Sequence, residues 1–452
     1  MLPAIFYENR KTLALAAPII AGQVGQMLMG WADTLMVGRV SVTALAACAF
    51  ANTILAVALV FGFGVMSSVT VRASQAFGAG RGTGKVHRSG LVLGAGLGVM
   101  LCGLMFALLP VLHWLGQPPE VNRAVVGFLI LTAISVIPVM LFTAAKNFAE
   151  ALSRPWPPFW IVLGGVALNV ALNFVFIFGT LGAPALGLTG AGLATLIARI
   201  ASLLVLLAWL HRSRYFRPHL ARLAGERSLW RELRDLLRIG LPAGGQYLAE
   251  VSAFATASLM MGWIGVNALA AHQIAITCAA TTFMVPLGIG MAVTVRVGQA
   301  VGARNFQRVR PIAFGGLGLA LAVMICTALG FLILSRSIAG LFVADPAVLA
   351  TAAGLLVIAG LFQVVDGTQI VAMNALRGLG DVHVPMGVAV FSYWMVALPL
   401  SYLLTFRAHF GPVGIWMGLA LGLLTASIAL TWRFVWKSSP ARLATAHAVP
   451  HV

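Results

Sequence analysis

The chain alternates long apolar stretches with short polar segments from one end to the other. Twelve stretches are about 20 residues long, which is enough for an α-helix to cross the hydrocarbon core of a bilayer. They lie at residues 12–35, 46–71, 89–112, 125–147, 159–180, 188–211, 238–262, 270–295, 312–334, 347–373, 384–406 and 412–436. This pattern predicts an all-α polytopic membrane protein with twelve transmembrane helices.

The second six stretches repeat the first six at one fixed offset, which is the spacing from Pro18 to Pro242. At the same offset the segment VTVRASQAFGAG, which starts at Val69, returns as VTVRVGQAVGAR, which starts at Val293. A period this long belongs to a duplicated domain rather than to a solenoid. In a membrane protein it predicts two pseudo-symmetric six-helix bundles that face each other across a binding site.

The repeat also predicts the domain organisation. We expect an N-terminal six-helix lobe over residues 1–211, a basic cytoplasmic linker over 212–237, a C-terminal six-helix lobe over 238–437 and a cytoplasmic tail over 438–452. Six spans are an even number, so both lobes insert into the membrane the same way up. The repeats are therefore expected to be parallel, related by an axis along the membrane normal.

Composition agrees with a membrane protein, because 60% of the residues are hydrophobic and only 9% are charged, against about 25% charged residues in soluble domains. The net charge of +18 arises mainly from basic residues in short loops. Most of them fall on one predicted side, which the positive-inside rule places in the cytoplasm with both termini. The opposite side carries Arg39, Arg123, Arg336 and Arg407. The basic residues form no single face with stacking aromatics, so no nucleic-acid partner is expected.

Three of the 11 acidic residues fall inside predicted spans: Asp33, Glu250 and Asp366. The remaining acids, Glu8 and Glu232 among them, fall in loops or near span ends by the same pattern. A carboxylate inside a span costs about 2.5–3.5 kcal/mol on insertion scales, so each of the three is a functional candidate. The alternative is a polar group that faces a wet cavity or pairs with arginine.

At the repeat offset, none of the three intramembrane acids meets another acid. Asp33, Glu250 and Asp366 correspond to Ala257, Gln26 and Phe142, respectively. A duplicated scaffold with unduplicated ionisable groups indicates that the two halves have specialised.

Two uses fit these acids. A carboxyl group shielded from water can bind and release a proton, and carboxylates with other oxygen ligands can hold a hard cation such as Na⁺. The sequence does not decide whether the coupling ion is Na⁺ or a proton. It also does not decide whether Na⁺ would bind at Glu250 and Asp366 or at Asp33. A cationic substrate could also pair with the same groups.

Helix five carries two asparagines near the predicted depth of Asp33. Asn169 and Asn173 are four residues apart and share one face of that helix. Together with Asp33 they would form a polar nest for a cation or a proton, and Thr195 on helix six is a weaker addition. The alternative is that both asparagines only join helices through hydrogen bonds.

Further polar residues in the spans are candidates for lining a cavity. They are Gln23, Gln26, Gln246, Tyr247 and Gln273. Arg199 is the one deep cation, interpreted as a side chain that snorkels or pairs with a carbonyl group. His272 is either a residue at the cavity edge or a packing residue. No phosphate-binding loop, metal-ligand spacing or catalytic cluster is visible, so neither an enzyme nor a cofactor is expected.

Several motifs resemble those of one transporter family. They are GWADTLMVGRVSVTALAA from Gly30, the two VTVR segments after helices two and eight, and NALRGLGDVHVP from Asn374. Over nearly its whole length, the chain resembles the multidrug and toxic compound extrusion (MATE) transporters, in particular the NorM-like branch. The resemblance implies a V-shaped pair of six-helix bundles that exports organic cations by Na⁺ or H⁺ antiport.

The resemblance also implies roles for individual residues. Asp33 matches the helix-one aspartate of the bacterial branches, and Glu250 and Asp366 match an acidic pair associated with cation coupling. Asn169 and Asn173 match the polar positions beside the helix-one aspartate. The second of these is aspartate in some members, so Asn173 removes one negative charge from the site in the N-terminal lobe.

The expected function is therefore a secondary active antiporter in the bacterial inner membrane. It would export cationic amphipathic drugs or toxic organic compounds in exchange for Na⁺ or H⁺, by alternating access of its two lobes. Only membrane lipid, substrate and the coupling ion are expected as partners, and a monomer would contain the whole pathway. The alternatives are a lipid-linked saccharide flippase, which would place several cations in its cavity, an intramembrane enzyme and a passive channel.

Overall fold

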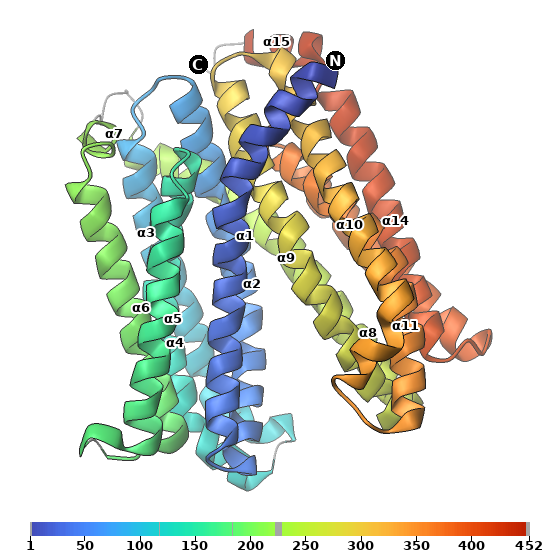
Figure 1. The fold of residues 1–452 in the computed structure, drawn as a ribbon. Coiled ribbons are helices and arrows are strands. Elements are labelled where there is room, and N and C mark those ends of the chain that lie inside the picture. The colour runs from blue at the N-terminus through green and yellow to red at the C-terminus, as the bar shows by residue number, and fades with distance from the viewer. Residues whose placement is uncertain (1, 117, 183, 222–227, 449–452) are drawn as a thin grey trace. The chain divides into compact units, whose positions relative to one another are not determined.

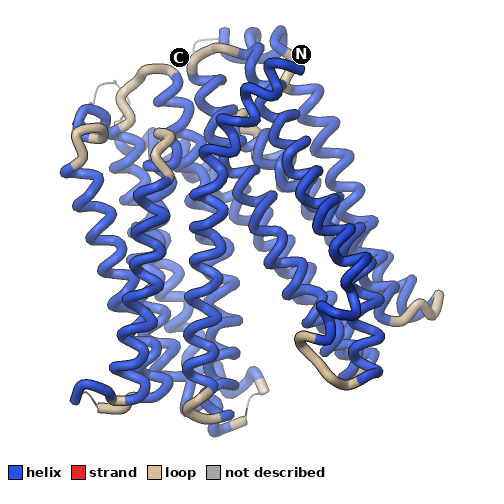
Figure 2. Tube along the Cα trace, in the orientation of Figure 1, coloured by secondary structure: helices blue, strands red, loops and turns tan. Residues whose placement is uncertain are grey.

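A computed structural model describes residues 2–116, 118–182, 184–221 and 228–448. The described residues form helices joined by loops, with no strand among them (Figure 2). Within the described ranges, twelve helices are long and apolar enough to cross a membrane, which confirms the predicted all-α class and the number of spans. Within the predicted linker and tail, residues 222–227 and 449–452 lie outside the described ones.

The six spans of the first repeat are α1 to α6, followed by a short helix, α7 (Figure 1). Their bounds are α1 Leu2–Gly38, α2 Val42–Gly78, α3 Gly84–Leu108, α4 Pro119–Ala151, α5 Trp156–Phe178, α6 Gly187–Arg212 and α7 Arg217–Ala221.

The second repeat supplies the other six spans, and the eleventh span of the chain is built from four helical segments. The bounds are α8 Leu229–Ile264, α9 Val266–Gly302, α10 Val309–Gly340, α11 Pro346–Gly378, α12 His383–Val390, α13 Leu398–Tyr402, α14 Pro412–Lys437 and α15 Pro440–Ala448, with π-helices η4 Phe391–Ala397 and η5 Leu403–Arg407 on either side of α13. Segments α12, η4, α13 and η5 together form the span from His383 to Arg407.

The helices form two compact units. The N unit contains residues 21–244, and the C unit contains residues 1–20 and 245–452. The first helix of each repeat therefore begins in the unit built mainly by the other repeat: α1 changes unit after Ile20, and α8 changes unit after Gly244. The repeat-related prolines Pro18 and Pro242 lie inside these two helices, just before each change of unit.

A buried ion pair fixes the beginning of α1 within the C unit. Arg296 on α9 pairs with Glu8, and its Nη1 also donates to Thr12 Oγ1 at 2.5 Å. Arg308 adds a second pair to the Glu8 carboxylate, with Nη2 2.9 Å from Oε1. Glu8 and Arg296 are both nearly fully buried, so their charges compensate each other away from water.

The N unit contains the repeat-related ion pair. Arg72 Nε on α2 lies 2.9 Å from Glu232 Oε1 on α8, and Arg72 Nη2 lies 3.3 Å from Asp235 Oδ2. Glu232 occupies the position of the second repeat that is equivalent to Glu8. Both acids lie near the start of a span, as one of the two predicted placements has it, but inside a helix rather than in a loop. Helices α1 and α8 extend past their apolar stretches into charged segments whose acids are neutralised by arginine.

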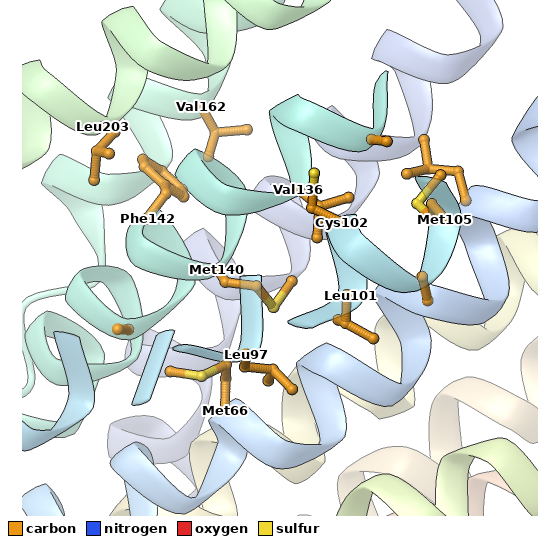
Figure 3. Packing of buried hydrophobic residues seen from close by; sticks show 14 of the residues in the cluster. Met66, Leu97, Leu101, Cys102, Met105, Val136, Met140, Phe142, Val162 and Leu203 are labelled. Carbon is orange, nitrogen blue, oxygen red and sulfur yellow. The ribbon is translucent and has the colours of Figure 1, made fainter. Parts of the chain in front are cut away.

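Each unit is organised around the fourth helix of its repeat. In the N unit α4 packs against α2, α3 and α6, and in the C unit α11 packs against α9, α10 and α14. Figure 3 shows part of the N-unit core, where Met140 of α4 lies near Met66 and Leu101. The approach of α3 to α4 depends on Gly94, because a Cβ atom there would lie 2.9 Å from the Met140 carbonyl oxygen. Small residues of this kind let membrane helices pack closely.

Candidate functional site

The structure brings the four polar residues predicted in the N-terminal lobe into one hydrogen-bonded group, here called the N-unit cluster: Asp33, Asn169, Asn173 and Thr195. Asn173 Nδ2 donates to Asp33 Oδ1 at 2.6 Å, and Thr195 Oγ1 donates to Asp33 Oδ2 at 3.2 Å. Asn169 Nδ2 donates to Thr195 Oγ1 at 3.2 Å, and Asn169 Oδ1 accepts from Asn173 Nδ2 at 3.3 Å. All four residues are buried.

Helix packing positions the members of the N-unit cluster. The two asparagines lie one turn apart on α5, so they present neighbouring amides on one face. Helix α6, which carries Thr195, approaches α5 closely because Gly190 faces the backbone of Phe176 and Gly165 faces the Ser202 hydroxyl. A Cβ atom at either glycine would collide with these groups.

Arg199 is the cation nearest to the N-unit cluster in sequence, one turn after Thr195 on α6. Its Nη1 donates to Ser135 Oγ on α4 at 2.6 Å, and its charge interacts with that of Asp33. The hydrogen-bond partner is therefore a side-chain hydroxyl, whereas the sequence pointed to a backbone carbonyl or to snorkelling. One carboxylate and one compensating arginine make this region close to neutral overall.

Glu250 of α8 and Asp366 of α11 also come together, within the C unit. Their carboxylates interact electrostatically, and the Tyr393 hydroxyl of η4 interacts with both. Gln369 Nε2, one turn after Asp366, donates to the Tyr393 hydroxyl at 3.0 Å. These four residues are called the C-unit cluster. Glu250 Oε2 is buried and accepts no hydrogen bond from the described residues.

Arg377 of α11 is the basic group that acts on the C-unit cluster. Its Nη1 donates to the Tyr247 hydroxyl at 3.1 Å, and its Nη2 donates to Gln246 Oε1 at 3.4 Å. Its charge interacts with Glu250, one turn after Gln246 on α8. Two of the predicted cavity-lining residues, Gln246 and Tyr247, thus hold a buried arginine whose charge acts on Glu250.

The other predicted cavity-lining glutamines lie apart from both clusters. Gln23 Oε1 accepts from Lys146 Nζ at 3.4 Å, and Lys146 also pairs with Glu150 at 3.5 Å. Gln26 and Gln273 have exposed side chains. Neither hydrogen-bonds to Asp33, Glu250 or Asp366 among the contacts of the described residues.

His272 is a packing residue in a hydrogen-bonded chain. Trp416 Nε1 donates to His272 Nδ1 at 3.2 Å, and His272 Nε2 lies 3.0 Å from Ser258 Oγ. Because the indole N–H can only donate, Nδ1 is an acceptor and Nε2 carries the hydrogen. The Ser258 hydroxyl itself donates to the Phe254 carbonyl oxygen. The imidazole is fully buried and neutral in this arrangement.

We expect Ser258→Ala to lower the free energy of unfolding by about 1 kcal/mol, because it leaves the His272 Nε2–H unsatisfied. Transport should keep its dependence on the ion gradient. Ser252→Ala is the matched control, since that hydroxyl bonds only within α8, to the Ala249 carbonyl. Unfolding in mixed micelles at increasing SDS fraction measures both. Equal losses for the two variants would contradict the assigned tautomer.

Sequence reasoning missed Tyr393, Gln369 and Ser135. A signal for Tyr393 was present, because it lies at the position of the second repeat that is equivalent to Asn169. Gln369 lies three residues after Asp366, on the same face of its helix. No pattern in the sequence pointed to Ser135 as the partner of Arg199.

Two of the three counterparts of the intramembrane acids lie in apolar cores, whereas Gln26, the counterpart of Glu250, is exposed. Phe142, which corresponds to Asp366, packs in the N-unit core together with Val162 and Leu203 (Figure 3). Ala257, which corresponds to Asp33, is fully buried in a C-unit core. Both clusters use the first and fifth spans of their repeat, but the N-unit cluster adds the sixth span and the C-unit cluster adds the fourth.

A family model described as MatE matches residues 18–175 and again residues 242–403. The two matches begin at the repeat-related prolines, Pro18 and Pro242, and so follow the repeat. The chain is 37% identical over 437 residues to the probable multidrug resistance protein NorM of Pseudomonas putida, with 95% of each chain covered. It is 38% identical to a protein of the same name from Rhodopseudomonas palustris, over 94% of this chain and 91% of that one.

Solved structures share the fold. The eukaryotic MATE transporter AtDTX14 matches with a TM-score of 0.89 at 19% identity, over 98% of both chains. A MATE protein in the bent conformation matches with a TM-score of 0.88 at 18% identity, over 99% of both chains. The chain therefore belongs to the MATE family, and it is a membrane transporter rather than an enzyme.

Proposed function

We propose that this transporter exports cationic amphipathic organic compounds in exchange for Na⁺ or H⁺, with the coupling ion bound at the C-unit cluster. The observation that carries the proposal is the pair of carboxylates, Glu250 and Asp366, which interact inside membrane spans. Among the described residues, one buried basic group, Arg377, acts on the pair, and it acts on Glu250. Two acids and one arginine leave a net negative charge. A cation supplies the missing charge, and oxygen ligands suit a hard ion such as Na⁺.

The names of the relatives support the proposal that the substrates are drug-like organic compounds. Proteins that are more than a third identical to this chain over nearly its whole length are described as multidrug resistance proteins. A lipid-linked saccharide flippase would need free cations to meet phosphates. The arginines near the two clusters, Arg199 and Arg377, hydrogen-bond to protein groups and interact with carboxylates.

In the proposed cycle, ion and substrate bind to opposite-facing states, and coupling requires that each prefers one state. The ion binds the acids when they face outward, where substrate leaves. Substrate binds after the ion has left inward. The N-unit cluster is a second ion or proton site on the same route, with Asp33 as its charged member. We further propose a bacterial inner-membrane location, cytoplasmic termini and a functional monomer.

Asn173→Asp is predicted to make efflux depend on pH. Asn173 Nδ2 lies 2.6 Å from Asp33 Oδ1, and two carboxylates at that distance hold one proton between them. We expect the pH midpoint of efflux to rise by about one unit or more, which corresponds to at least about 1.4 kcal/mol. Asn173→Ala, which removes the hydrogen bond to Asp33 without adding a charge, should shift the midpoint in the same direction by less than Asn173→Asp. An unchanged pH profile in Asn173→Asp would exclude Asp33 from the coupling route.

The test of the proposed function is efflux from proteoliposomes loaded with a fluorescent organic cation, such as ethidium. A Na⁺ gradient and a pH gradient are imposed separately, each with the membrane potential clamped. The proposal predicts that one of the two gradients accelerates efflux well above that of protein-free vesicles. Equal efflux with and without both gradients would contradict antiport and favour a passive pathway.

A further inference from the structure

The eleventh span leaves the α-helical register where it passes the acids. Its counterpart in the first repeat, α5, is a regular α-helix, whereas residues Phe391–Ala397 form the π-helix η4. Pro399 explains the difference, because it has no amide hydrogen to donate to the Met395 carbonyl and its ring crowds that carbonyl in an α-helix. The wider π turn relieves both problems. The residue of α5 equivalent to Pro399 is Val175.

Tyr393 lies in this π-helix and is fully buried. Its hydroxyl is 3.0 Å from Gln369 Nε2 and 3.4 Å from Gln369 Oε1. The shorter contact has the amide N–H donating to the phenol oxygen. Two contacts place Tyr393 next to Glu250. The Trp394 indole N–H donates to the Ala249 carbonyl oxygen at 3.2 Å, and the Tyr393 ring lies 6.2 Å from that of Phe254, one turn after Glu250. The phenol hydrogen can be directed to Gln369 Oε1 or to the Glu250 carboxylate, which accepts.

The repeat gives an independent reason to examine Tyr393. It occupies the position equivalent to Asn169, whose side chain holds Thr195 in the N-unit cluster and so reaches Asp33 through one intermediate hydroxyl. The same position of the scaffold thus supplies a neutral hydrogen-bonding group to the acid in each unit. Asp33 and Glu250 lie on the first helix of their repeats but at positions that are not equivalent, so this shared position is not explained by duplication of the acids.

We propose that Tyr393, oriented by Gln369, is a positioning residue that turns the Glu250 carboxylate toward Asp366 and so sets the affinity of the C-unit cluster for the coupling cation. This inference rests on the proposed coupling role of Glu250 and Asp366. Glu250 has a second oxygen, Oε2, that is buried without a hydrogen-bond partner among the described residues. When Tyr393 holds the carboxylate in place, Oε2 is left available as a ligand for the cation.

Tyr393→Phe tests the inference, since it removes the hydroxyl and keeps the ring. In proteoliposomes we expect the half-saturating concentration of the driving ion, Na⁺ or H⁺, to rise about tenfold, equivalent to about 1.4 kcal/mol. The half-saturating concentration of ethidium should be unchanged. Tyr402→Phe is the matched control, because Tyr402 lies in the same span with an exposed side chain.

Gln369→Leu provides the second variant. It leaves the Tyr393 hydroxyl unoriented, so the apparent ion affinity should fall by a smaller factor, about threefold, in the same direction. Because the two residues act in sequence, the double variant should be no worse than Tyr393→Phe alone. A purely structural role would change stability and maximal rate but leave the half-saturating ion concentration in place, and that result would overturn the inference.

These experiments distinguish failure of the positioning role of Tyr393 from failure of the proposed function. If Glu250→Gln and Asp366→Asn abolish ion-driven efflux while Tyr393→Phe retains full ion affinity, only the positioning role is wrong. If Glu250→Gln and Asp366→Asn keep ion-driven efflux, the coupling role of the C-unit cluster is wrong, and the inference falls with it.

Discussion

Asp366→Asn is expected to lower ion-driven efflux about 100-fold, close to that of protein-free vesicles. The change keeps the shape of the side chain but removes one of the two negative charges of the C-unit cluster; the other, Glu250, interacts with Arg377. Glu250 and Arg377 then nearly compensate each other, so the cation loses its charge partner. Losing one partner of a buried charged pair costs about 3–5 kcal/mol, which is more than the roughly 2.8 kcal/mol that a 100-fold change requires.

Asp345→Asn is the matched control for this variant. Asp345 is the N-cap of the same helix, α11, and accepts hydrogen bonds from the backbone amides of Ala347 and Val348. Asparagine is an equally good N-cap, so stability and efflux should both stay near those of the unaltered protein. If Asp366→Asn retains more than about a tenth of the ion-driven rate, the C-unit cluster is not the primary coupling site.

The second large effect concerns the start of α1. Glu8→Gln is expected to lower the free energy of unfolding by about 3–5 kcal/mol, because Arg296 is left buried without its counter-charge. Glu232→Gln, the repeat-related change, should cost less. Arg72 keeps a second acid, Asp235, at 3.3 Å.

Unfolding in mixed micelles compares these variants, with Glu120→Gln as the control at an exposed acid in the first turn of α4. The combined change Glu8→Leu with Arg296→Met should cost less than Glu8→Gln alone, because it removes both buried charges. If Glu8→Gln is no more damaging than Glu120→Gln, the ion pair does not anchor α1 in the C unit.

The pair Glu8–Arg296 also shows where sequence reasoning fails. Hydropathy found all twelve spans, because each is a stretch of about 20 apolar residues whose signal does not depend on tertiary contacts. It could not find the charged extensions of α1 and α8, since a helix that enters the polar region loses its apolar signal while keeping its hydrogen bonds. The sequence does show that Glu8 and Glu232 occupy equivalent positions of the two repeats. This equivalence could have indicated that both acids have a structural role.

The two clusters illustrate a different limit. Residue types and spacing pointed to Asp33, Asn169, Asn173 and Thr195, and the structure connects these four by hydrogen bonds. In the C unit the two acids were evident, but their neighbours were not. The position of Tyr393 depends on a π-helix, and that departure from α-helical register follows from Pro399 rather than from any periodic pattern.

Because the two units share one scaffold but carry different polar clusters, we expect the two clusters to have different roles. The N-unit cluster has one acid, hydrogen bonds to both oxygens of its carboxylate and a nearby arginine. The C-unit cluster has two acids and a buried carboxylate oxygen that accepts no hydrogen bond from the described residues. The first is close to neutral and the second is negative, so a metal cation should prefer the second, while a proton can be exchanged at either.

Counterflow tests the central claim of coupled antiport most directly. Proteoliposomes are loaded with ethidium, and radioactive Na⁺ is added outside while the total Na⁺ concentration and the pH are equal on both sides. A parallel experiment uses an internal pH-sensitive dye. Antiport predicts that the outward ethidium gradient drives net inward movement of Na⁺ or H⁺ although no ion gradient is imposed, and that Asp366→Asn abolishes this movement. Ethidium leaving the vesicles with no inward movement of either ion would contradict the account.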